Sequence, residues 1–188
     1  MQMEMQTSES PLKRPSLNPM VMHHALVKLL KVDKVVTDAQ LVKLNLDGKR
    51  LPHVSLTVRP LPNSSVELGV TFRALSQKYL YAKTESLPHY AGLAAGRHAL
   101  HAALDEWTVM GNGKSICPDA EWRSGGRVIA VEYDAGYRPG VVAQKMESFK
   151  AYDAVIWVTP SRVRTERLQA KYPAVQVITV DYWTASQT

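Results

Sequence analysis

The chain has 188 residues, 45% of them hydrophobic, so it can bury a substantial core as one large domain or two small ones. Its formal net charge of +6 favours an anionic partner, and we expect double-stranded DNA, although a basic surface can also serve solubility alone. A single cysteine excludes an intramolecular disulfide and favours a reducing cytoplasm, and no apolar run is long enough to span a membrane.

The first third of the chain has the pattern of a small DNA-binding unit. Residues 1–19 are polar and lack the apolar stretch of a signal peptide, so we expect a disordered arm. Apolar residues at helical spacing over 20–32, followed by a short helix over 37–44 with Thr37 as N-cap, are typical of a helix-turn-helix. We therefore predict a winged-helix-like DNA-binding region over 20–86, with Lys43 among its DNA contacts.

The remainder of this region is less clear. Residues 54–58 alternate like a short strand, whereas residues 64–77 fit either a helix or a strand. Residues 78–83 are expected to form a strand that could serve as the wing, with Lys78 and Lys83 touching the DNA backbone. The alternative is an edge strand that its lysines protect from aggregation.

Residues 88–183 have the pattern of an α/β domain. The predicted elements are a helix over 88–107, strands over 115–122 and 127–133, a helix over 140–151, a strand over 154–158, a helix over 161–171 and a strand over 175–180. Two glycines between the first two strands indicate a hairpin. We predict a mixed sheet flanked by helices, in the order αββαβαβ.

Four carboxylates are expected near the end of this hairpin. Side chains alternate along a strand, so Glu132 shares a face with Asp134, and Asp119 shares a face with Glu121. Carboxylates that converge repel one another, and a hard divalent cation such as Mg²⁺ or Mn²⁺ can hold them together. The alternative is that they are solvated strand ends or pair with nearby arginines.

Cations on the following helices could complete such a site. Gln144 and Lys145 lie about one turn inside the helix over 140–151, from which they could reach back to the strand end. Lys145 could orient water or steady a phosphate, or it could be an ordinary solvated lysine. Arg162 and Arg164 belong to a basic run that could follow DNA phosphates, or be a solvated helix face.

Pro118-Asp119, followed on the next strand by Glu132-x-Asp134 and then by a helix, resembles the core of the PD-(D/E)xK nuclease superfamily. The resemblance implies that Asp119 and Glu132 ligate Mg²⁺ and that a lysine two residues after the glutamate helps to activate water. Asp134 stands in place of that lysine, where it is predicted as a third metal ligand. Some members carry the lysine on the following helix, so Lys145 is the candidate replacement, and catalysis is conditional on it.

A second resemblance covers about residues 90–170. The succession of Gly96-Arg97-His98, Cys117-Pro118-Asp119-Ala120, Val131-Glu132-Tyr133-Asp134 and Val158-Thr159-Pro160 is similar to the replication-relaxation proteins of plasmids and mobile elements. That resemblance implies an N-terminal winged helix and a nuclease-like C-terminal half. We therefore predict a DNA-binding protein that carries a metal-dependent endonuclease site and that could form a homodimer. The alternatives are a non-catalytic replication or regulatory factor and a protein-interaction module.

Three further candidates have simpler explanations. His98 and His101 lie three apart on a predicted helix, a spacing that can ligate a metal but more commonly serves packing. Glu106 on the same helix could lie beside the metal, as a helix glutamate often does in PD-(D/E)xK folds. Residues 111–115 end in Gly-Lys-Ser but lack the first glycine of a phosphate-binding loop, so they are expected to form a turn.

Overall fold

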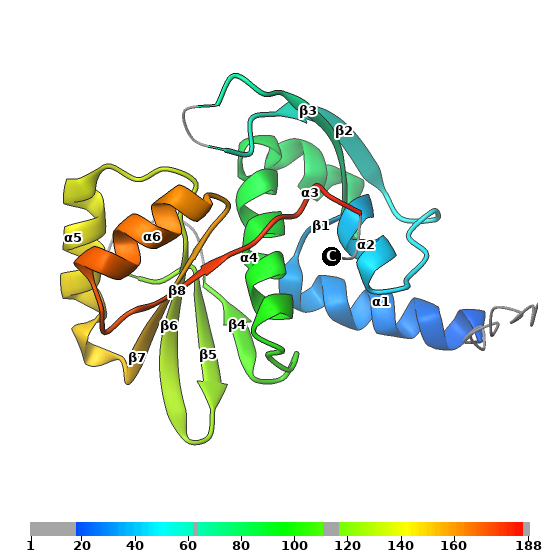
Figure 1. Ribbon diagram of the computed structural model, residues 1–188. Helices are drawn as coiled ribbons and strands as arrows, with labels where there is room; N and C mark the ends of the chain where they lie inside the picture. Colours follow the sequence, from blue (N-terminus) through cyan, green and yellow to red (C-terminus); the bar gives the residue numbers. More distant parts are fainter. Residues whose placement is uncertain (1–17, 62–63, 111–116, 186–188) are drawn as a thin grey trace, which may run out of the picture.

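The computed structural model describes residues 18–61, 64–110 and 117–185 and shows a mixed α/β protein with two sheets (Figure 1). The helices are α1 (Pro19–Asp33), α2 (Asp38–Lys43), α3 (Gln77–Ala82), α4 (Leu87–Ala99), α5 (Pro139–Ser148) and α6 (Arg162–Lys171), with short 3-10 helices η1 (Thr84–Ser86) and η2 (Phe149–Ala151). The strands are β1 (Val36–Thr37), β2 (His53–Val58), β3 (Leu68–Arg73), β4 (Trp107–Val109), β5 (Ala120–Ser124), β6 (Arg127–Tyr133), β7 (Ala154–Thr159) and β8 (Gln176–Thr179). Of the arm predicted over residues 1–19, residues 1–17 lie outside the described residues, and Pro19 already begins α1.

The smaller sheet is antiparallel and has the strand order β1-β3-β2. Thr37 caps α2 as predicted, since its hydroxyl accepts from Gln40 N–H while the Gln40 side chain accepts from Thr37 N–H. No helix follows α2 within residues 44–52. The ambiguous segment over 64–77 contains strand β3, in which the side chains of Val70 and Phe72 are buried on one face.

The predicted strand over 78–83 is wrong, because these residues lie mostly in helix α3. Ser76 starts this helix by accepting a hydrogen bond from Tyr79 N–H at 3.3 Å. Leu80 is fully buried, whereas Lys78 and Tyr81 are exposed. The buried side of this helix is therefore set by Leu80, and Lys78 and Tyr81 lie on its exposed side.

The larger sheet has the strand order β4-β5-β6-β7-β8, antiparallel from β4 to β6 and parallel from β6 to β8. Helix α4 packs on one face, and α5 and α6 lie beside each other on the other face (Figure 1). The predicted hairpin between β5 and β6 is confirmed. Gly125 and Gly126 form its turn with φ values of 58° and 78°, which glycine adopts readily.

The helix expected over 88–107 is shorter, and an additional strand follows it. Helix α4 ends in a Schellman motif, in which His101 has a φ of 53° and Ala102 N–H donates to Arg97 C=O at 3.1 Å. The chain then turns back, and β4 pairs with β5 at the sheet edge. The element order of this half is therefore αβββαβαβ rather than αββαβαβ.

The two halves of the chain share one apolar core. Residues from β2, β3 and α3 belong to the same buried cluster as residues from α4, β6 and β7. Buried Arg97 on α4 also binds Asp33 at the end of α1 through two hydrogen bonds of 2.7 and 2.9 Å. After β8 the chain crosses back to the smaller sheet, where Tyr182 packs against Phe72 (Figure 1). None of the helices in the described ranges is both long and apolar enough to cross a membrane.

Candidate functional site

Two of the predicted carboxylates come together where β5 begins opposite the end of β6. Ala120 pairs with Val131, so Asp119 lies opposite Glu132 and on the same face of the sheet. Glu132 is fully buried between the neighbouring strands, whereas the Asp119 side chain is 17% exposed. Asp119 is held in place because its Oδ2 accepts a hydrogen bond of 2.8 Å from Tyr133 N–H.

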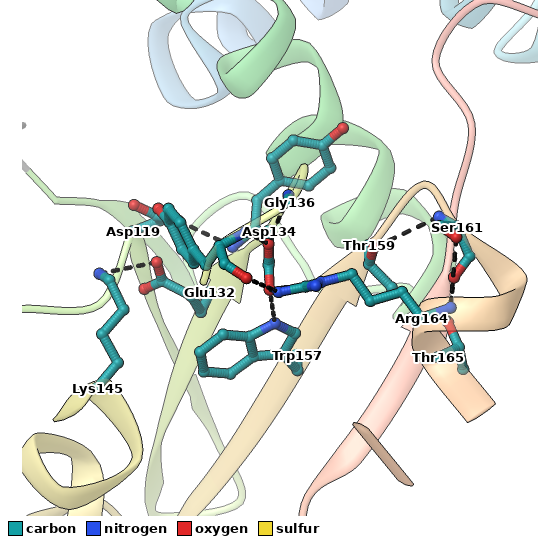
Figure 2. Close-up of polar contacts among 12 residues, drawn as sticks. Asp119, Glu132, Asp134, Gly136, Lys145, Trp157, Thr159, Ser161, Arg164 and Thr165 are labelled. Carbon is teal, nitrogen blue, oxygen red and sulfur yellow. Dashed lines mark hydrogen bonds and ion pairs between the residues drawn. The ribbon is translucent and has the colours of Figure 1, made fainter. Parts of the chain in front are cut away.

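Lys145 reaches this carboxylate pair from α5. Its Nζ lies 2.8 Å from Glu132 Oε1, and its side chain is only 10% exposed (Figure 2). The ammonium also lies 5.5 Å from the ring centre of Tyr137 and 5.7 Å from that of Phe149. The structure therefore brings together Asp119, Glu132 and Lys145.

The environment of Glu132 is unfavourable for an isolated negative charge. Burial, followed by the charge of Asp119, raises the pKa of Glu132 to about 8, and Lys145 and Tyr137 oppose this increase. Neither carboxylate oxygen has a well-aligned hydrogen bond among the described residues, although Lys145 lies at ion-pair distance. Buried polar atoms usually have partners, so this carboxylate retains capacity to accept a cation or a donor.

His89 and Tyr137 are two members of the site that the sequence did not reveal. His89, in the first turn of α4, has its Nε2 3.1 Å from Asp119 Oδ1 and its ring edge-on to that of Tyr133 at 5.4 Å. Tyr137 follows β6 and lies near Glu132. Burial of the Tyr137 ring, followed by the charge of Glu132, raises the pKa of its phenol. Neither residue belongs to a recognisable motif, and only the packing of α4 and of the turn after β6 places them here.

Asp134 occupies a different environment from the one predicted for a metal ligand. Its Oδ1 accepts hydrogen bonds from Gly136 N–H at 2.7 Å and Tyr137 N–H at 2.6 Å. Its Oδ2 accepts from Trp157 Nε1 at 2.9 Å and from Arg164 at 2.5 Å (Figure 2). Asp134 therefore orders the turn after β6 and anchors α6, and both of its oxygens are already engaged.

A metal ion at this site would have to be held mainly by two carboxylates. Within the described ranges, no group of three His, Cys, Asp or Glu side chains is arranged to hold a metal. Asp119 and Glu132 nevertheless fit Mg²⁺, which commonly binds one or two carboxylates and keeps several waters or phosphate oxygens. The fit depends on the ionised form of Glu132, which a cation would favour.

Of the other predicted site residues, most lie outside this cluster. Gln144 is exposed on α5, and Arg162 is exposed on α6, where it pairs with Glu166 at 3.3 Å. Lys43 pairs with Asp181 at 3.3 Å. Lys78 on α3 and Lys83, the residue that follows α3, have exposed side chains.

The remaining candidates from the sequence either contact other side chains or are exposed. Glu121 accepts a hydrogen bond of 3.0 Å from the Tyr152 hydroxyl, and Glu106 accepts one of 3.0 Å from Trp122 Nε1. His98 lies 3.3 Å from buried Asp33, whereas His101 is exposed at the end of α4. The turn expected over 111–115 lies outside the described residues.

Comparisons with known proteins were made with the whole chain. No family model, curated protein sequence or solved structure matches it. The case for a function therefore depends on the geometry of Asp119, Glu132 and Lys145 and on the charge of the chain.

Proposed function

We propose that this is a DNA-binding protein in which Asp119, Glu132 and Lys145 form the metal-dependent site of an endonuclease. The observation that carries the proposal is the 2.8 Å ion pair between Lys145 and Glu132 directly beside Asp119. A lysine on α5 thereby reaches the position that the missing strand lysine would serve. This placement supports the resemblance to the PD-(D/E)xK superfamily, as does the succession α4-β4-β5-β6-α5-β7.

Each residue of the cluster has a distinct role in this proposal. Asp119 and Glu132 would hold Mg²⁺ or Mn²⁺, which when bound supplies charge neutralisation at the phosphate and a water of lowered pKa. His89 positions Asp119 through its contact with Oδ1. Lys145 would orient the attacking water or donate to a phosphate oxygen once a bound cation compensates the charge of Glu132.

DNA binding is supported by charge and by the form of the N-terminal half. In the chain, α1 precedes β1 and α2 lies between β1 and β2, and the three strands form a sheet of order β1-β3-β2. This arrangement supports a winged-helix-like region. Strand β2 exposes one polar face made of His53, Ser55 and Thr57. Because no helix follows α2 within 44–52, we infer that contacts would come from α2 and the β2–β3 hairpin. The presence of such a region before the α/β half supports the resemblance to replication-relaxation proteins.

The test is cleavage of supercoiled and linear DNA by the purified protein with Mg²⁺ or Mn²⁺. We expect nicked or linear products from the unchanged protein, and a loss of about a hundredfold or more in Asp119→Asn, Glu132→Gln and Lys145→Met. Glu147→Gln removes an exposed carboxylate from the same helix as Lys145 and should cleave normally. Cleavage that persists in Glu132→Gln would refute the assignment of this site.

A second candidate function is a DNA-binding factor that does not cleave, with the α/β half as a scaffold. The engagement of both Asp134 oxygens favours it, since this leaves only two carboxylates for a metal. Salt-sensitive binding to duplex DNA, without cleavage in any divalent metal, would support this candidate over the nuclease. Absence of binding at low salt would exclude both.

A further inference from the structure

A groove with a volume of about 610 Å³ lies between α5 and α6, on the face of the larger sheet that also carries Glu132. Its basic wall is formed by Arg164, Arg167 and Lys171, which lie on one side of α6 because they are spaced by three and four residues. The opposite wall comes from α5 and the turn before it. The apolar and aromatic lining residues are Tyr137, Pro139, Val142, Val163, Leu168 and Tyr172.

The groove has a net positive charge. Arg164 donates to Asp134 and to the carbonyl of Tyr137, so its charge is compensated by a buried carboxylate. Arg167 and Lys171 have no ion pair with any side chain in the described part of the chain, and no carboxylate lines the groove. Two cations without an ion pair therefore line a hollow whose remaining lining residues are mostly aromatic or aliphatic, together with Ser161 and the paired Arg164.

This combination suits a ligand with a compact anion joined to a flat, weakly polar group. Phosphate oxygens pair well with arginine and lysine, while a nucleobase can stack on a tyrosine ring or lie against aliphatic side chains. The groove also adjoins the carboxylate cluster, since Tyr137 lines the groove and lies beside Glu132 and Lys145.

We propose that the groove between α5 and α6 binds a nucleoside monophosphate, either free or as the phosphorylated end of a DNA strand. The phosphate would lie against Arg167 and Lys171, and the base against Tyr137 or Tyr172. The inference deepens the proposed function and rests on it for the choice of a nucleotide over other aromatic anions.

The experiment is calorimetric titration of the full chain at low salt with EDTA present, so that no metal contributes. The probes are AMP, adenosine, inorganic phosphate, and a trinucleotide with and without a terminal phosphate. We expect AMP to bind about tenfold or more tightly than either adenosine or inorganic phosphate. If the terminally phosphorylated trinucleotide binds more tightly than AMP, the natural ligand is a strand end, and the reverse order indicates a free nucleotide.

Paired variants separate the groove from general charge effects. Arg167→Ala combined with Lys171→Ala should weaken AMP binding about tenfold or more, because both phosphate contacts are lost. Arg123→Ala combined with Lys150→Ala removes the same charge from exposed side chains that do not line the groove, and should leave binding within about twofold. Both pairs of positions are exposed, and matching thermal unfolding will show that the fold is retained.

Three results would overturn the inference. These are equal losses in the two double variants, AMP binding no tighter than inorganic phosphate, and no AMP binding at millimolar concentration. The outcome is independent of cleavage, because EDTA removes any metal and the proposed phosphate contacts, Arg167 and Lys171, are separate from Asp119, Glu132 and Lys145. AMP binding without metal-dependent cleavage would therefore count against the nuclease alone, and cleavage without AMP binding would count against the groove alone.

Discussion

Replacing Glu132 by glutamine probes the energetic cost of the buried carboxylate. In the folded protein, burial and the charge of Asp119 raise the pKa of Glu132 from its ordinary value of 4.5 to about 8. Between these values the folded protein binds a proton that the unfolded chain has already released. The contribution of protonated Glu132 to the free energy of unfolding is therefore fully present below pH 4.5 and is lost as the pH rises towards 8.

The magnitude follows from proton linkage. A difference of one bound proton changes the free energy of unfolding by about 1.4 kcal/mol for each pH unit. Between about pH 5.5 and about pH 7.5, Glu132 should thus cost the unchanged protein up to about 3 kcal/mol of stability. Glutamine does not titrate, so Glu132→Gln should lack this loss and gain stability relative to the unchanged protein by a similar amount over the same interval.

The assay is urea unfolding followed by tryptophan fluorescence at both pH values, with EDTA present. Glu147→Gln is the matched control, because its side chain is 71% exposed on α5 and its difference from the unchanged protein should be the same at both pH values. A difference between Glu132→Gln and the unchanged protein that stays constant with pH would refute the argument. In that case the carboxylate would be ionised at neutral pH and stabilised by its neighbours.

Other predictions concern positions whose surroundings are equally specific. Arg97→Met should lower the free energy of unfolding by about 3–5 kcal/mol, because buried Asp33 loses both hydrogen bonds from the guanidinium, whereas Arg123→Met on the surface should cost less than about 1 kcal/mol. Gly92→Ala should destabilise by about 1–3 kcal/mol or more, since the new methyl group would meet a tyrosine ring at 2.1 Å, whereas Gly140→Ala in open space should stabilise by about 0.5–1 kcal/mol. Both pairs are measured by urea unfolding. Asp134→Asn should lower the melting temperature yet retain metal-dependent cleavage per folded molecule, and complete loss of cleavage at a temperature where it is folded would contradict its structural role.

The features that could be predicted from sequence are those that local chemistry determines. The hairpin follows from Gly125 and Gly126, and the shared face of Asp119 and Glu132 follows from strand alternation across that hairpin. The burial of the strand over 154–158 also follows from its continuous apolar run. The reach of Lys145 to Glu132 was expected as one of two alternatives, and only the packing of α5 on the sheet distinguishes them.

The features that could not be predicted depend on contacts between distant parts of the chain. His89 meets Asp119 only because Gly92 allows α4 to lie directly against the ring of Tyr133. The end of α4 was missed because His101 adopts a left-handed conformation that glycine usually supplies in such a motif. Asp134 was assigned to the metal by its spacing from Glu132, but Arg164, thirty residues later, takes up its charge.

The return of the C-terminal segment to the smaller sheet has a consequence for the synthesis of this protein. Thr37 donates its hydroxyl hydrogen to the carbonyl of Tyr182, 145 residues later, and Lys43 pairs with Asp181. On a ribosome, the first sheet is therefore made long before the segment that covers it has left the exit tunnel. Contacts of such separation slow folding, and we expect the smaller sheet to complete its folding only after residues 181–182 have been synthesised.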